Sequence, residues 1–276
     1  MNKYVTAAPR MTEREVLPHK IKMGDREIAF ASFGRGSPTV VFETGLGAES
    51  VEWGAVARDV ANFSRVFYYD RAGRGKSMAA PKPRDALMAV EDLHELLRAT
   101  DVTGPFLLVG HSLGGLLMRV FAQRYRAEVA GLVLVDSLHE DQFDVMGAAF
   151  PPPDPSDSPP LTAIRQFWTG GWKKPDATDE RIDLLESVRQ GREITSLDDL
   201  PIHVLTAGTF RVMPSVPDAH RERLQGLWEG LQARFLLLSS RTMQSFAPAS
   251  GHFIQRDDPQ AIVEAIRDVR RRALSG

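Results

Sequence analysis

Residues 106–115, FLLVGHSLGG, decide the fold of this chain. The four apolar residues at 106–109 predict a short buried strand. The pentapeptide GHSLG at 110–114 then matches the pattern GxSxG, in which a sharp turn from strand to helix exposes a serine hydroxyl above a sheet. Glycines are needed on both sides because side chains would clash there, and the helix that follows offers backbone N–H groups to a developing oxyanion. The motif therefore predicts that Ser112 is a nucleophile.

Short apolar runs alternate with helical patterns along the rest of the chain, which predicts an α/β fold. The central runs are apolar on both faces, as strands of a parallel sheet with helices on each side require. The expected strands are Ile28–Phe33, Thr39–Glu43, Val66–Asp70, Phe106–Val109, Leu132–Asp136, Ile202–Ala207 and Thr242–Phe246. The expected amphipathic helices are Asp85–Ala99, Leu113–Tyr125 and Pro259–Arg272.

The composition excludes several classes of protein. Of 276 residues 43% are hydrophobic and 25% are charged, which is typical of a soluble globular chain. The 34 Lys and Arg nearly balance the 36 Asp and Glu, so no basic excess favours nucleic acid or a membrane as partner. The chain has no Cys, which excludes disulfides and thiolate chemistry, and its seven His lack metal-binding spacings. We therefore expect no metal and no cofactor.

The N-terminal residues 1–20 show no apolar stretch of the kind that a secretory signal requires. No apolar run elsewhere approaches the roughly 20 residues that span a bilayer. We therefore expect residues 1–20 to be a loosely ordered leader of a cytoplasmic protein.

A long segment, residues 137–199, interrupts the alternation between two expected strands. It contains the stretch PPPDPSDSPP at 151–160, which we expect to be irregular, and a helical pattern at Asp179–Arg192. We predict that this segment is a lid over a ligand site at the carboxyl ends of the strands, inserted into a core of residues 21–136 and 200–276. A surface insertion without such a role is the alternative. The lid residues expected to contact a substrate are Phe143, Met146, Phe167, Trp168 and Trp172.

Three motifs together resemble the α/β-hydrolase superfamily: DRAGRGKS at 70–77, GHSLGG at 110–115 and SGHF at 250–253. Their order, their spacing and the strands that precede the first two agree with that superfamily. The resemblance covers about residues 21–274. It implies an eight-stranded, mostly parallel sheet flanked by helices, an inserted helical lid, and a catalytic triad of serine, acid and histidine.

The resemblance places the general base at His252, which lies in the loop before the final helix and would accept the proton of Ser112. It also implies an oxyanion hole built from two backbone N–H groups, those of Leu113 and Leu46. Relatives often carry histidine where this chain has Thr44. Because the donor is a main-chain group, this difference does not remove it.

The acid has two candidate positions. Relatives usually place it after the strand that follows the lid, but the first carboxylate beyond Ile202–Ala207 is Asp218. Other relatives place the acid at the end of the strand before the lid, which here ends in Asp136. We favour Asp136, because its strand is expected to lie beside the nucleophile strand and to end at the same sheet edge. Asp218 is the alternative.

These residues predict a serine hydrolase that cleaves carboxylic esters through an acyl-enzyme intermediate. The aromatic side chains of the lid favour small to medium, largely apolar substrates. The serine excludes the branches with an aspartate nucleophile, the haloalkane dehalogenases and epoxide hydrolases. Hydrolysis of a lactone, amide or C–C bond remains open, as does a non-catalytic ligand-binding protein on the same scaffold. The expected partner is a small-molecule ester, with no nucleic acid and no membrane.

Overall fold

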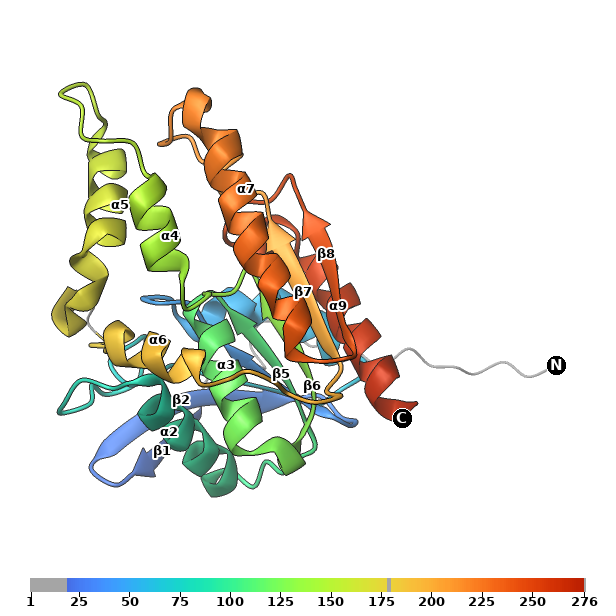
Figure 1. Ribbon diagram of the computed structural model, residues 1–276. Helices are drawn as coiled ribbons and strands as arrows, with labels where there is room; N and C mark the ends of the chain where they lie inside the picture. Colours follow the sequence, from blue (N-terminus) through green and yellow to red (C-terminus); the bar gives the residue numbers. More distant parts are fainter. Residues whose placement is uncertain (1–18, 178–179, 276) are drawn as a thin grey trace.

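The computed structural model describes residues 19–177 and 180–275 (Figure 1). Its eight-stranded sheet has the order β1-β2-β4-β3-β5-β6-β7-β8. β2 is antiparallel to both β1 and β4, and all other neighbours are parallel, which confirms the predicted fold class. The strands are β1 (His19–Met23), β2 (Arg26–Phe33), β3 (Thr39–Glu43), β4 (Val66–Tyr69), β5 (Phe106–His111), β6 (Val129–Val135), β7 (Ile202–Ala207) and β8 (Thr242–Ala247).

Helices cover both faces of this sheet (Figure 1). α2 and α3 pack on one face, and α1 and α9 pack on the other. The helices are α1 (Gly54–Val60), α2 (Ala86–Ala99), α3 (Leu113–Arg124), α4 (Gln142–Ala149), α5 (Pro159–Thr169), α6 (Leu184–Arg192), α7 (Asp218–Arg234), α8 (Ile254–Asp257) and α9 (Pro259–Leu274). Short 3₁₀ turns are η2 (Ser50–Trp53), η3 (Arg126–Glu128), η4 (Gly171–Lys173), η5 (Pro175–Ala177) and η6 (Phe235–Leu238).

The apolar side chains of the central strands divide between the two faces. In β5, Leu108 joins the core beneath α2 and α3, whereas Leu107 and Val109 join the core beneath α1 and α9. This alternation follows from the two-residue period of a strand. All three side chains are fully buried, so the strand is held on both faces. The two cores thereby fix the carboxyl ends of β3, β5, β6 and β7, where the candidate site lies.

The N-terminal boundary of the predicted core needs a correction. His19 and Lys20 were expected to belong to a loose leader, but they begin β1, which pairs with β2. The backbone hydrogen bonds of that pairing hold them in place. The rest of the predicted leader lies outside the described residues.

Two predictions within residues 137–199 also need correction. Pro159 and Pro160 were expected to be irregular, but they form the first turn of α5, where a helix tolerates proline because its N–H would have no partner. The helical pattern at Asp179–Arg192 yields a helix only from Leu184, capped by the side chain of Asp183. Asp179 lies outside the described residues.

The inserted segment, residues 137–199, shares its packing with α7. In Figure 1 the helices α4 and α5 stand beside each other above the sheet, and α7 rises next to them. A third apolar cluster joins these helices and includes Met146 from α4, Leu161 from α5 and Trp228 from α7. The structure above the sheet edge is therefore built by the inserted segment and α7 together.

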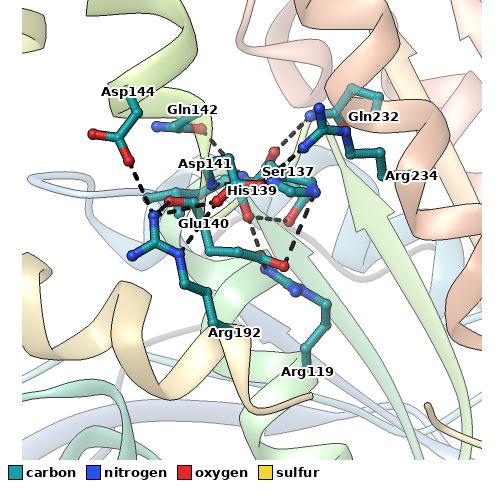
Figure 2. Close-up of polar contacts among 11 residues, drawn as sticks. Arg119, Ser137, His139, Glu140, Asp141, Gln142, Asp144, Arg192, Gln232 and Arg234 are labelled. Carbon is teal, nitrogen blue, oxygen red and sulfur yellow. Dashed lines mark hydrogen bonds and ion pairs between the residues drawn. The ribbon is translucent and has the colours of Figure 1, made fainter. Parts of the chain in front are cut away.

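Polar contacts fasten the inserted segment to the core (Figure 2). Arg119 of α3 is fully buried and donates to the backbone oxygen of Leu138 at 3.0 Å and to Glu140 at 2.9 Å. Arg192, at the end of α6, donates to Asp141 at 3.2 Å. The beginning and the end of the segment are thus held next to each other and to α3.

Candidate active site

Ser112 occupies the turn between β5 and α3 with φ 52° and ψ −119°. This backbone conformation is costly for a residue with a side chain, and it recurs where function requires it. The neighbouring glycines make the turn feasible. A Cβ on Gly110 would clash with the backbone of Gly114, and a Cβ on Gly114 would clash with the carbonyl of Glu43. The sequence GHSLGG therefore folds into a tight elbow whose serine lines a cavity.

His252 and Asp136 lie in direct contact. Nδ1 of His252 is 2.7 Å from Oδ2 of Asp136, which is fully buried at the end of β6. Asp218 does not reach the histidine, because it starts α7 with a side chain that is 90% exposed and paired with Arg221 at 3.0 Å. Of the two candidate acids, the structure brings Asp136 to His252.

Further donors surround the Asp136 carboxylate. Oδ1 accepts from the backbone N–H of Ala207 at 3.0 Å and from the indole of Trp228 at 2.7 Å. Oδ2, which faces His252, also accepts from the hydroxyl of Thr209 at 2.5 Å. Burial alone would raise the pKa of Asp136, but the hydrogen bonds and the imidazole opposite lower it below its ordinary value. The group is therefore held as a carboxylate.

Ser112 and His252 line the same cavity. Within the described part of the chain, the structure gives no hydrogen bond between the serine hydroxyl and the imidazole. Such contacts are often long before substrate binds and tighten in the reacting complex. The arrangement thus places the candidate nucleophile and the candidate base at one cavity, without a hydrogen bond between them.

His111, inside the GHSLGG motif, supports the loop that carries His252. Its Nε2 donates to the backbone oxygen of His252 at 2.8 Å, and its Nδ1 accepts from the amide of Gln255 at 3.2 Å. Burial, followed by the neighbouring His252, lowers the pKa of His111 to about 3. The ring is neutral at physiological pH, in the tautomer that satisfies both contacts.

This burial predicts a loss of stability in mild acid. Between its ordinary pKa of 6.5 and the folded value of about 3, His111 binds a proton only in the unfolded chain. The contribution of His111 to the free energy of unfolding is therefore complete above about pH 6.5 and decreases at lower pH. At about pH 5 the free energy of unfolding is lower by about 2 kcal/mol. We expect urea denaturation at about pH 7.5 and pH 5 to show this loss in wild type and a correspondingly smaller loss in His111→Gln. Equal losses in both proteins would contradict the assignment.

Leu46 and Leu113, the residues expected to supply the oxyanion-hole donors, both line the cavity with Ser112. Leu113 is the first residue of α3, so its N–H has no partner within the helix. Among residues 19–177 and 180–275, neither backbone N–H donates to another protein group. Both amides thus have no acceptor among the described protein groups.

The cavity above Ser112 has a volume of about 370 Å³ and is mainly apolar. In the part of the chain that the structure describes, no Lys, Arg, Asp or Glu lines it. Its walls come from the loop after β3, the inserted segment, the loop after β7, α7 and the His252 loop. The lining residues are Gly45, Leu46, His111, Ser112, Leu113, Leu138, Gln142, Phe143, Ile164, Phe167, Trp168, Leu184, Thr209, Phe210, Met213, Trp228, His252 and Phe253.

Three of the five expected lid contacts, Phe143, Phe167 and Trp168, line this cavity. Met146 and Trp172 do not. Met146 is fully buried in the apolar cluster that α4 shares with α5 and α7. Trp172 stacks on Phe143, with ring centroids 4.2 Å apart and planes at 8°. These two side chains support the wall of the cavity from behind and do not form its surface.

No metal-binding constellation is present: the described ranges contain no group of three or more His, Asp or Glu side chains arranged to hold an ion. Their helices also include none that is long and apolar enough to cross a membrane.

Residues 38–168 match the family model for the alpha/beta hydrolase fold. The structure resembles a putative lipase from Acinetobacter baumannii, with a TM-score of 0.63 and 19% identity over 94% of this chain and 92% of that one. It also resembles a thermophilic esterase from Thermogutta terrifontis, with a TM-score of 0.62 and 19% identity over 93% of this chain and 99% of that one. The chain thus has the α/β-hydrolase fold, and this fold with its lipase and esterase neighbours supports hydrolase activity.

Among curated proteins, the chain is 27% identical over 238 residues to the uncharacterized protein YqjL of Bacillus subtilis. That alignment covers 86% of this chain and 85% of the relative. With several other curated relatives the chain aligns over only 14–39% of their length. The resemblance to YqjL extends through most of both chains.

Proposed function

We propose that this protein is a serine hydrolase that cleaves carboxylic esters of small to medium, largely apolar substrates. The observation that carries the proposal is the strained elbow of Ser112 at one cavity with the hydrogen-bonded pair His252–Asp136. Structural similarity to a lipase and an esterase supports the same reaction class.

In the proposed mechanism, Ser112 attacks the acyl carbon while Nε2 of His252 accepts the hydroxyl proton. Asp136 holds the proton on Nδ1 of the ring and stabilises the imidazolium that forms. The amides of Leu46 and Leu113 would donate to the oxyanion of the tetrahedral intermediate. His252 then gives its proton to the leaving alcohol, and water releases the acid from the acyl-enzyme through the same base.

The lining of the cavity supports a neutral substrate. Burying an unpaired charge in an apolar cavity is costly, and the described lining offers no side chain of opposite charge. Its volume of about 370 Å³ lies toward the lower end of ligand pockets. We propose that the inserted segment and α7 together act as the lid that encloses this substrate.

Asp176 and Glu180, the described acidic side chains that could bind a substrate amine, do not favour an aminopeptidase; Asp179, the third candidate, lies outside the described residues. Glu180 is buried and paired with Arg71 at 2.7 Å. Asp176 pairs with Arg181 at 2.9 Å and does not line the cavity. An ester therefore fits the described site better than a peptide with a free amino terminus.

The decisive experiment is a panel of activated esters in which the acyl and alcohol groups vary independently, with matched amides and lactones. We expect a burst of alcohol followed by steady turnover of short to medium neutral esters, and no burst from Ser112→Ala. Preference for lactones or amides would replace the ester assignment within the same machinery. Binding of these compounds without any burst would favour a non-catalytic ligand-binding protein.

Trp168→Ala is expected to change substrate choice more than overall activity. Its indole lines the cavity, whereas Trp172 lies behind Phe143 and serves as the matched control. One methylene in an apolar pocket is worth about 1–3 kcal/mol, so removing an indole should shift the ratio of kcat/KM between bulky and short acyl groups by about tenfold or more. Equal effects across the whole panel would show that Trp168 only supports folding.

A further inference from the structure

Arg71, from the motif DRAGRGKS that the proposed mechanism does not use, is buried beneath the oxyanion loop, residues 44–47. Its side chain is only 4% exposed. Nη1 donates to Glu43 at 2.5 Å and to the backbone oxygen of Thr44 at 2.7 Å, and Nη2 donates to the backbone oxygen of Gly45 at 2.7 Å. Both nitrogens at the end of the guanidinium group thus hold the loop by its carbonyl groups.

The bond to Gly45 determines where the next N–H points. The carbonyl of Gly45 and the N–H of Leu46 belong to one trans peptide unit, since the cis bonds of the described chain lie elsewhere. In a planar trans peptide the two groups point in opposite directions. Because the carbonyl faces Arg71, the N–H of Leu46 faces away from it, and Leu46 lines the cavity beside Ser112. The loop also touches the nucleophile closely, because a Cβ on Gly45 would lie 3.3 Å from Cβ of Ser112.

The other end of the loop is held by a residue of the inserted segment. Oε1 of Glu180 accepts from the backbone N–H of Gly47 at 2.5 Å, and Oε2 accepts from Nε of Arg71 at 2.7 Å. Glu180 is therefore shared between the loop and the arginine. A displacement of this part of the inserted segment would act directly on the loop that carries Leu46.

From these contacts we propose that Arg71 and Glu180 are positioning residues that orient the Leu46 amide as an oxyanion donor. Arg71 also acts through its charge. A cation bonded to the Gly45 carbonyl polarises the peptide and strengthens the Leu46 N–H as a donor. Lysine would keep the charge but lose the planar fork that reaches both carbonyls. This inference rests on the proposed function and specifies how its transition state is stabilised.

The test compares Arg71→Lys and Glu180→Gln with wild type by two measurements. The first is kcat and KM for the best ester. The second is the rate of covalent labelling of Ser112 by a fluorophosphonate, whose partly negative phosphoryl oxygen would occupy the oxyanion hole whatever the natural substrate is. Loss of an oxyanion donor typically costs about 10²–10³ in kcat, so a misoriented donor should cost about 10–10² for Arg71→Lys, with KM changed less than about threefold.

Arg26→Lys is the matched control. Arg26 lies against the same small cavity as Arg71 but donates to Asp92 at 3.1 Å, away from the oxyanion loop. We expect its labelling rate to stay within about twofold of wild type. Glu180→Gln keeps the shape of the side chain and should slow labelling less than Arg71→Lys does. If Arg71→Lys fails to fold, as judged by circular dichroism, the labelling rate of Glu180→Gln alone tests the inference.

The inference is overturned if a folded variant labels at the wild-type rate, or if KM rises while kcat is unchanged. It is supported if labelling and kcat fall together. If wild type reacts with the fluorophosphonate but hydrolyses no ester, the ester proposal fails. The labelling rates then still test whether Arg71 and Glu180 orient the Leu46 amide. Should wild type not react at all, the proposed serine chemistry and this inference both fail.

Discussion

Ser112→Ala is expected to lower kcat by about 10⁴–10⁶ while the fold and ligand binding persist. The substitution removes only the hydroxyl group, and no described protein group forms a hydrogen bond with it. The elbow itself is held by the neighbouring glycines and by backbone bonds, including that from the N–H of Ser112 to the oxygen of Val135 at 3.1 Å. Steady-state kinetics on the best ester, with urea denaturation as a check of stability, measure the effect.

The control for this assignment is a double mutant. His252→Ala should lose activity to a similar extent, because Ser112 then has no base to accept its proton. The losses should not multiply in Ser112→Ala/His252→Ala, since the two residues act as one unit. Multiplicative losses would mean that His252 acts elsewhere. A pure sample of Ser112→Ala with more than a tenth of wild-type activity would refute the role of Ser112.

The fold could be predicted because its signals are local. The bounds expected for Thr39–Glu43 and Ile202–Ala207 are those observed, since buried parallel strands read as uninterrupted apolar runs. The elbow at GHSLGG is equally local, because the glycines that permit the turn stand next to the serine. The contact between His252 and Asp136 was expected from two sources: the resemblance to α/β hydrolases placed the base at His252, and the rule that neighbouring parallel strands end at the same sheet edge favoured Asp136.

The wall that α7 contributes to the cavity was not predicted, although Leu224, Leu227, Trp228 and Leu231 recur at helical spacing. Its buried face combines apolar residues of this set with Gln225 and Gln232. Gln225 donates to the backbone oxygen of Ala207, and Gln232 donates to that of Ser137. A helix that packs over strand ends must satisfy their backbone groups, and the two buried amides do this beside the apolar residues.

The environment of Arg71 could not be predicted either, because its partners Glu43 and Glu180 are 28 and 109 residues away in sequence. Only the fold brings them together. A buried ion pair produces no periodic pattern in the sequence. An acidic residue in a long inserted segment is therefore expected to be exposed to solvent. The same holds for Arg119, whose bond to Leu138 also supports the elbow, since the N–H of Leu138 donates to the backbone oxygen of Ser112 at 2.9 Å.

The acid offers the sharpest remaining test, and Asp136→Asn is expected to lower kcat by about 10²–10⁴ with the fold preserved. The donors around Asp136 explain why. The indole of Trp228 and the N–H of Ala207 both donate to Oδ1, so the amide oxygen of an asparagine must stay on that side. Its NH₂ group then faces Nδ1 of His252 and selects the tautomer that carries its proton on Nε2. That tautomer cannot accept the proton of Ser112.

Asp218→Asn is the matched control, and it should cost less than about tenfold because its carboxylate faces solvent at the start of α7. Thr209 allows a second check, since its hydroxyl lies 2.5 Å from Oδ2 of Asp136, on the side that faces His252. A carboxylate introduced there by Thr209→Asp in the Asp136→Asn background would again face Nδ1, so part of the lost kcat should return. A loss of under tenfold in Asp136→Asn, or a large loss in Asp218→Asn, would show that Asp136 is not the acid, because only the group that fixes the histidine tautomer can have the larger effect.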